Sequence, residues 1–147
     1  ASDPGVEVGS VIQSVGATRT LTQGESGSTC LFDVATGVVY TLPDPAVGLT
    51  FNFLVKTAVS SNAHKFITAT ATQFLVGGCG SFSSAVAEGG DAFAADGTTH
   101  RACSSSGTTT GGQPGQLFTV TGLSSTLWAV TGNTIGSGTM ATPFATS

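Results

Sequence analysis

The stretch LFDVATGVVYTLPDPAVGLTFNFLV, residues 31–55, decides the fold class. Its Pro43-Asp44-Pro45 segment cannot continue a central strand, because each proline has a fixed φ and no amide hydrogen to donate. Beyond it, Phe51, Phe53 and Val55 alternate with more polar residues at the period of two that is typical of a half-buried strand. The stretch therefore predicts two strands joined by a hairpin-like connection.

The rest of the chain reads as further short strands. The runs Leu117–Gly122 and Leu127–Gly132 are joined by Leu123-Ser124-Ser125-Thr126 and predict a second hairpin. Gly77–Gly80 is expected to end a short strand, residues 88–96 to form a loop or one helical turn, and the low-complexity residues 104–115 to be mobile unless a neighbour orders them. The predicted fold is all-β, a sandwich or jelly-roll-like barrel of about eight to ten short antiparallel strands.

The predicted organisation is an extended N-terminal arm, residues 1–17, followed by a single β-domain, residues 18–147. A chain of 147 residues is long enough for one real core. In the arm, Val6, Val8 and Val11 alternate without an evident hairpin partner, so we expect them to contact a neighbouring subunit or a partner surface; a frayed terminus is the alternative.

Charge is scarce in this sequence. Charged residues make up 8% of the chain, against about 25% in typical domains. The surface must therefore consist largely of hydroxyls, backbone and small side chains, and we expect much of it to be covered in an assembly. The net charge of −4 with four scattered cations disfavours nucleic-acid binding. The absence of a long apolar run disfavours a membrane span, and the N-terminus does not resemble a signal peptide, so synthesis in the cytoplasm is expected.

The cysteines give little indication of a catalytic or metal-binding site. Cys30, Cys79 and Cys103 include no CxxC pair, which leaves buried free thiols or a Cys79 to Cys103 bond. The Gly77–Ser81 segment resembles the GxCG signature of viral chymotrypsin-like cysteine proteases, but His64, its only upstream base, lies too close in sequence for that family.

The remaining ionisable groups suggest no metal or cofactor site. Glu88, Asp91 and Asp96 do not have the spacing of a calcium-binding EF-hand loop. His100 and Arg101 lack a partner at metal-ligand spacing, so we expect them at the surface or in a subunit contact. No catalytic residue, cofactor or metal is predicted.

Two parts of the chain carry a resemblance to a known group of proteins. These segments are Leu21-Thr22, Ser26-Gly27, Asp33 with Thr36-Gly37, Tyr40–Pro45, Gly48-Leu49 and Phe51–Phe53, and near the C-terminus Leu127–Gly132, Gly136–Gly138 and Thr142–Phe144. In these segments the chain resembles the small capsid decoration, or cement, proteins of tailed bacteriophages.

This resemblance implies a non-enzymatic virion protein on the capsid exterior. Such a protein binds neighbouring copies of the major capsid protein and stabilises the assembled lattice, and a homotrimer is expected. The alternative is a phage fibre or host-surface receptor-binding domain, which should show an exposed aromatic cluster at its loop tips. A small hydrolase is the least supported class, because a base and an acid are missing.

Overall fold

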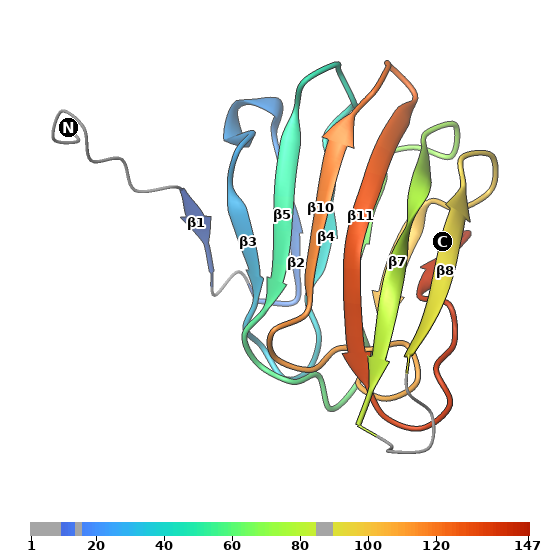
Figure 1. The fold of residues 1–147 in the computed structure, drawn as a ribbon. Helices are drawn as coiled ribbons and strands as arrows, with labels where there is room; N and C mark the ends of the chain where they lie inside the picture. The colour runs from blue at the N-terminus through green and yellow to red at the C-terminus, as the bar shows by residue number, and fades with distance from the viewer. Residues whose placement is uncertain (1–9, 14–15, 85–89) are drawn as a thin grey trace, which may run out of the picture.

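Two β-sheets pack face to face in this protein (Figure 1). The computed structural model describes residues 10–13, 16–84 and 90–147. The larger sheet has seven strands in the order β1 (Val11–Ile12), β3 (Thr29–Phe32), β5 (Thr50–Val55), β10 (Leu117–Gly122), β11 (Leu127–Gly136), β7 (Phe74–Ser83) and β8 (Gly90–Asp96). The smaller sheet has five, in the order β12 (Phe144–Ala145), β9 (Ala102–Ser105), β6 (His64–Ile67), β4 (Val39–Thr41) and β2 (Thr18–Thr20).

The predicted all-β sandwich is confirmed, and its pairing is mixed rather than antiparallel throughout. The 3-10 turn Gln23–Glu25 is the one helical element of the described residues. From β2 to β6 each strand lies in the opposite sheet from the one before it. A chain that crosses between sheets at every step returns to the first sheet running in its original direction, so β3 pairs with β5, and β2 with β4, in parallel. The antiparallel expectation is therefore wrong for these pairs.

The hairpin expected within residues 31–55 is also wrong. β4 lies in the five-stranded sheet and β5 in the seven-stranded sheet, so the proline segment between them crosses from one sheet to the other. The connection spans residues 42–49, which is longer than the two to five residues of a tight hairpin and leaves room for this crossing. The alternation itself is confirmed, because Phe51, Phe53 and Val55 are buried.

Aromatic side chains fill the space between the sheets. Phe53 of β5 stacks on Phe66 of β6 with ring centroids 4.4 Å apart. Trp128 is fully buried and meets Phe51 edge to face, so both residues belong to the core. The Tyr40 hydroxyl donates a hydrogen bond of 2.6 Å to the Leu31 carbonyl and thereby ties the five-stranded sheet to the seven-stranded sheet.

The C-terminal hairpin is confirmed, since β10 and β11 pair antiparallel. β11 continues to Gly136, beyond the predicted run Leu127–Gly132.

The glycines of Gly77–Gly80 lie inside a strand instead of ending one. β7 runs unbroken through them and pairs with β11 in parallel from Phe74 to Ser83. A Cβ on Gly77 would lie 2.0 Å from the Val130 carbonyl oxygen, so glycine is required for β7 to approach β11 this closely.

Residues 90–96 form a strand where a loop or helical turn was expected. β8 pairs antiparallel with β7 and ends the seven-stranded sheet (Figure 1). The partner strand β7 stabilises an extended conformation that the local sequence does not specify.

The low-complexity segment 104–115 is held by the protein's own chain. Gln113 and Gly115 donate backbone hydrogen bonds to the carbonyls of Ile135 and Val55. The buried Gln116 side chain accepts bonds from the amides of Gly112 and Ile135. No neighbouring molecule is needed to order this loop.

The three cysteines are free and buried. This finding favours the first of the two alternatives, buried thiols, over a Cys79 to Cys103 bond. Burial raises the pKa of the Cys30 thiol to about 12. Among the described residues, no helix is long and apolar enough to span a membrane.

Candidate contact face

The outer face of the seven-stranded sheet is the candidate functional surface. The strand registers place alternate side chains of β3, β5, β10, β11 and β7 on this face, at positions that are half-buried or exposed. The residues at these positions are Thr29, Leu31, Thr50, Asn52, Leu54, Leu117, Thr119, Thr121, Leu127, Ala129, Thr131, Asn133, Ile135, Phe74, Val76, Gly78, Gly80 and Phe82. We call this set the neutral face, because none of its members is charged.

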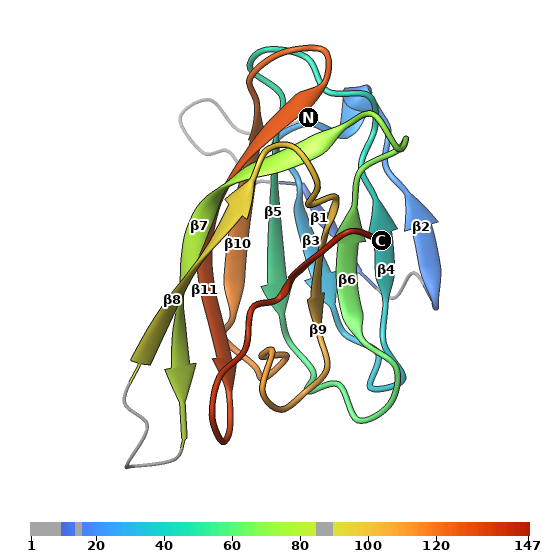
Figure 2. The same ribbon diagram turned by 90° about the vertical axis from the view of Figure 1, so that its right-hand side faces the viewer.

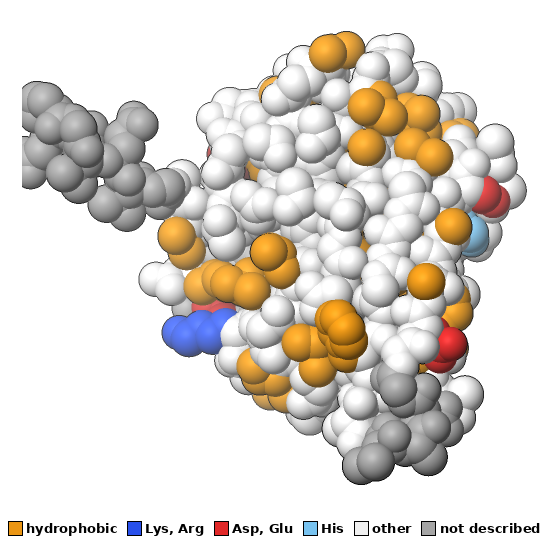
Figure 3. Space-filling view, viewed as in Figure 1, with side chains coloured by type: hydrophobic (Ala, Val, Ile, Leu, Met, Phe, Trp, Pro, Cys, Tyr) orange, Lys and Arg blue, Asp and Glu red, His pale blue; other side chains and the backbone are white. Residues whose placement is uncertain are grey.

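Figure 3 looks onto the neutral face. Most of the surface is white, which marks hydroxyls, amides and backbone, and apolar side chains form separate orange groups. The blue and red side chains lie at the margins of the view. A sequence that is only 8% charged makes such an uncharged surface possible, and the strand order brings it together.

A polar row crosses the middle of the neutral face. Thr29 is aligned with Asn52, Asn52 with Thr119, and Thr119 with Thr131 on four adjacent strands. The Thr119 hydroxyl donates to the Asn52 side-chain oxygen at 2.7 Å. Cross-strand pairs of this kind hold neighbouring strands in register and keep the side chains close to the sheet surface.

An apolar row lies beside this polar row. Leu31, Leu54 and Leu117 are aligned across β3, β5 and β10, and Leu117 is 39% exposed. Further along the same face, Ile135 is aligned with Phe82, whose side chain is 57% exposed. The neutral face thus offers apolar contact area and hydroxyl groups together. A partner would bind it through shape and hydrogen bonds, with little dependence on salt.

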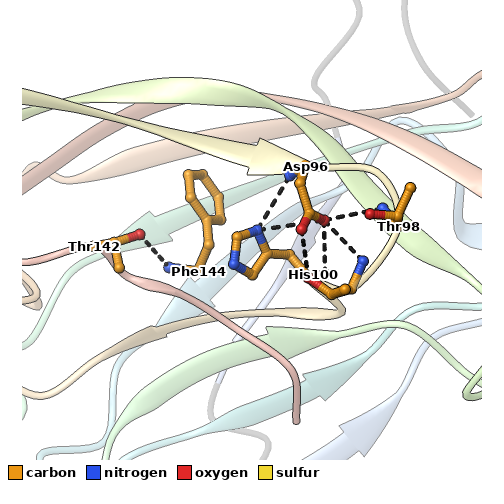
Figure 4. A network of polar contacts seen from close by, with 6 residues as sticks. Asp96, Thr98, His100, Thr142 and Phe144 are labelled. Atoms are coloured by element: carbon orange, nitrogen blue, oxygen red, sulfur yellow. Dashed lines mark hydrogen bonds and ion pairs between the residues drawn. The ribbon is translucent and has the colours of Figure 1, made fainter.

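His100 and Arg101, predicted as contact residues, are bound to their own chain between β8 and β9. The His100 Nδ1 accepts a hydrogen bond of 3.1 Å from the Asp96 amide, and its ring lies beside Phe144 (Figure 4). Arg101 donates from Nε to the Thr68 hydroxyl and from Nη2 to the Thr68 carbonyl. Both residues fasten the connection between the two sheets, and their role in a contact with another molecule stays a prediction.

The Asp96 carboxylate organises the same connection. It accepts bonds from the amides of Thr98, Thr99 and His100 and from the Thr99 hydroxyl. The hydrogen bonds from Thr99 contribute most to holding the pKa of Asp96 well below its usual range. The carboxylate thus shapes the turn that follows β8. In the described part of the chain, no group of three or more His, Cys, Asp or Glu residues could hold a metal ion. Glu88 lies outside the described residues.

Of the three arm valines predicted as contact residues, one is described. Val11 lies in β1, which pairs in parallel with β3 of the same chain, and its side chain is 54% exposed. Its neighbour Ile12 is buried in the core. Val6 and Val8 lie outside the described residues, so the contact hypothesis for them stays a prediction.

His64 and Cys79 do not form a catalytic pair. The His64 ring stacks on Phe32 of β3 and donates from Nε2 to the Thr57 carbonyl at 2.8 Å. Cys79 lies on β7, and three strands separate β3 from β7 in the sheet, which corresponds to roughly 19 Å. Burial raises the pKa of the Cys79 thiol, whereas a nucleophile requires a lowered one.

The neutral face was missed by reading the sequence. The alternation of apolar residues with Thr, Asn or Ala was visible in each strand, but the neighbours of each strand were not. Comparison with known proteins adds no identification, since no family model, curated protein or solved structure matches this chain.

Proposed function

We propose that this protein is a non-enzymatic structural protein that binds the outer surface of an assembled tailed-bacteriophage capsid through its neutral face. The sequence resemblance supplies the class of protein. The observation that carries the proposal is the uncharged outer surface on five adjacent strands, which is suited to permanent coverage by another protein.

The mechanism is linkage between binding and assembly. A protein that binds the assembled lattice but not free capsid subunits stabilises the lattice by mass action, and the gain grows with the logarithm of its concentration above Kd. A rigid sheet loses little conformational entropy on binding, which favours such a role. The major capsid protein is the proposed partner, and the capsid exterior of the virion is the proposed location.

The receptor-binding alternative receives less support. It requires a cluster of aromatic side chains exposed at loop tips, whereas Trp128 and Tyr40 are fully buried, and Phe82 near the end of β7 is the one exposed aromatic residue of the described part of the chain. The exposed residues Val47 and Leu123, in the β4–β5 and β10–β11 loops, are aliphatic.

Co-sedimentation with capsid shells tests the proposal. Shells of the major capsid protein encoded in the same genome are mixed with the protein, and the bound fraction is compared with that on unassembled capsid protein. We expect binding to shells alone and a higher melting temperature of the decorated shells.

Matched lysine variants locate the surface. Thr131→Lys places a charge on the exposed centre of the neutral face, and Thr20→Lys places the same charge on β2 of the other sheet. We expect Thr131→Lys to abolish binding and Thr20→Lys to bind like the unmodified protein. Equal binding by both variants would show that the neutral face is not the contact.

A further inference from the structure

The free edge of β8 is a second candidate contact surface. β8 ends the seven-stranded sheet, and β7 is its one partner strand among the described residues. Figures 1 and 2 show this strand along the margin of the sheet, on the side opposite β1 and β3. Proteins commonly protect such an edge with charged side chains, proline or a bulge. Residues 90–96 contain no lysine or proline, and their charged residues are Asp91 and Asp96, which lie outside the central Ala92–Ala94 segment.

The hydrogen bonds around Asp96 show which backbone groups this edge presents. The Asp96 amide donates to His100 and not to β7, so it points away from the sheet. In an antiparallel pair, the N–H and C=O groups of one residue point toward the partner strand, and those of the next residue point away from it. Ala92 and Ala94 therefore present their N–H and C=O groups to the free edge, while His100 already occupies the Asp96 amide.

We propose that β8 pairs antiparallel with β8 of a second copy of this chain, about a two-fold axis at Phe93. In this register Ala92 of each copy lies opposite Ala94 of the other, and the free N–H and C=O groups of all four alanines are paired. The hydrogen bonds of this pairing require neither the Asp96 amide nor the backbone groups of Gly90. Phe93, which packs against the core of its own subunit, lies opposite its counterpart.

The charges on β8 are compatible with this register. Asp91 lies opposite Ala95 of the second copy, and Asp96 lies opposite Gly90. Moving the two-fold axis to Asp91 would place two carboxylates face to face, which is unfavourable. Moving it to Ala94 would require the Asp96 amide that His100 occupies. The two sheets would join with their neutral faces on the same side, so a dimer would present a doubled surface.

The contact is two-fold, so it predicts a dimer in solution, whereas the sequence alone led us to expect a trimer. Native mass spectrometry and light scattering of the purified full chain separate these outcomes. We expect a concentration-dependent dimer. A trimer, or a monomer at millimolar concentration, would overturn the pairing.

Two substitutions at one position isolate the edge hydrogen bonds. Ala94→Pro removes an outward N–H that β7 does not use, which an edge strand tolerates. The control Ala94→Val keeps the N–H and suits a strand. The two-fold axis brings the substituted residue of both copies into the contact, so two hydrogen bonds are lost. We therefore expect Ala94→Pro to weaken dimerisation about 100-fold with an unchanged circular-dichroism spectrum. Ala94→Val should remain a dimer, and equal dimerisation by both variants would overturn the proposal.

Cross-linking tests the register and does not depend on the proline variant folding. Phe93→Cys places two thiols opposite each other at the axis, within reach of a disulfide in a glutathione redox buffer. Asp91→Cys places its two thiols four residues apart along the strand, roughly 13 Å. We expect a covalent dimer of Phe93→Cys and none of Asp91→Cys. The opposite pattern, or no covalent dimer of either variant, would overturn this register. Because these tests use no capsid, they are independent of the proposed function.

Discussion

Replacing Gln116 with alanine should be among the most destabilising single changes to a polar residue. Its side chain is 2% exposed and connects three parts of the molecule. Oε1 accepts from the Gly112 amide at 2.9 Å and from the Ile135 amide at 3.1 Å, and Nε2 donates to the Ser105 hydroxyl at 2.8 Å. Gln116 thus joins the 106–115 loop, β11 of one sheet and β9 of the other.

The magnitude follows from the groups left behind. Gln116→Ala removes the acceptor of two backbone amides, and each buried donor without a partner costs about 1–3 kcal/mol. We therefore expect the free energy of unfolding to fall by about 2–6 kcal/mol, a large part of the stability of an ordinary domain. The missing side chain adds a small cavity, which acts in the same direction.

Urea denaturation followed by circular dichroism measures this loss. The matched control is Gln23→Ala, which deletes an exposed glutamine whose Nε2 donates to the Asp44 carbonyl at 2.9 Å. We expect the control to change the free energy of unfolding by less than about 0.5 kcal/mol. If Gln116→Ala and Gln23→Ala lose the same small amount, the buried network does not stabilise the fold as argued.

Three further predictions concern the core. Trp128→Ala should lower the free energy of unfolding by about 3–5 kcal/mol in the same urea assay. The control Leu123→Ala, at an exposed position, should change it little. Similar effects of the two substitutions would place Trp128 outside the core. Burial lowers the pKa of His64, so the unfolded chain binds its proton more readily, and stability should fall as the pH drops below about 6.5. The hydrogen bond to the Thr57 carbonyl and, after it, the nearby Asp33 oppose this shift more weakly. His64→Phe should flatten the pH dependence between pH 7 and 5, and an unchanged slope would contradict it. Finally, the raised pKa values of Cys30, Cys79 and Cys103 predict that Ellman's reagent labels no thiol in the native protein and three after unfolding; rapid native labelling would show an accessible thiol.

The local pattern of the sequence determined the fold class and much of the core. The alternation in residues 50–55 identified Phe51 and Phe53 as buried, and the runs around residues 117–122 and 127–132 identified the hairpin that contains Trp128. These features follow from side-chain periodicity and turn chemistry within a short segment, so they can be read without knowing what lies beside it.

The tertiary structure alone decided which strands are neighbours. The proline segment 43–45 ends a strand whether the chain then turns back within one sheet or crosses to the other sheet. Its sequence does not distinguish these two arrangements. Gly77 and its neighbours were expected to end a strand, and they continue it because β11 lies close enough to exclude a side chain. Residues 90–96 have little strand propensity of their own and are extended because β7 pairs with them.

The neutral face also has features that the sequence determines and features that only the tertiary structure decides. Each strand's threonines and leucines were visible in the sequence, but Leu31, Leu54 and Leu117 are distant in the chain and form one row only after three strands pair in register. The scarcity of charge could be read from composition, whereas its consequence, an uncharged surface on five adjacent strands, required the strand order. Sequence determines the two faces of a strand through its period of two, and long-range hydrogen bonding determines which strands share a face.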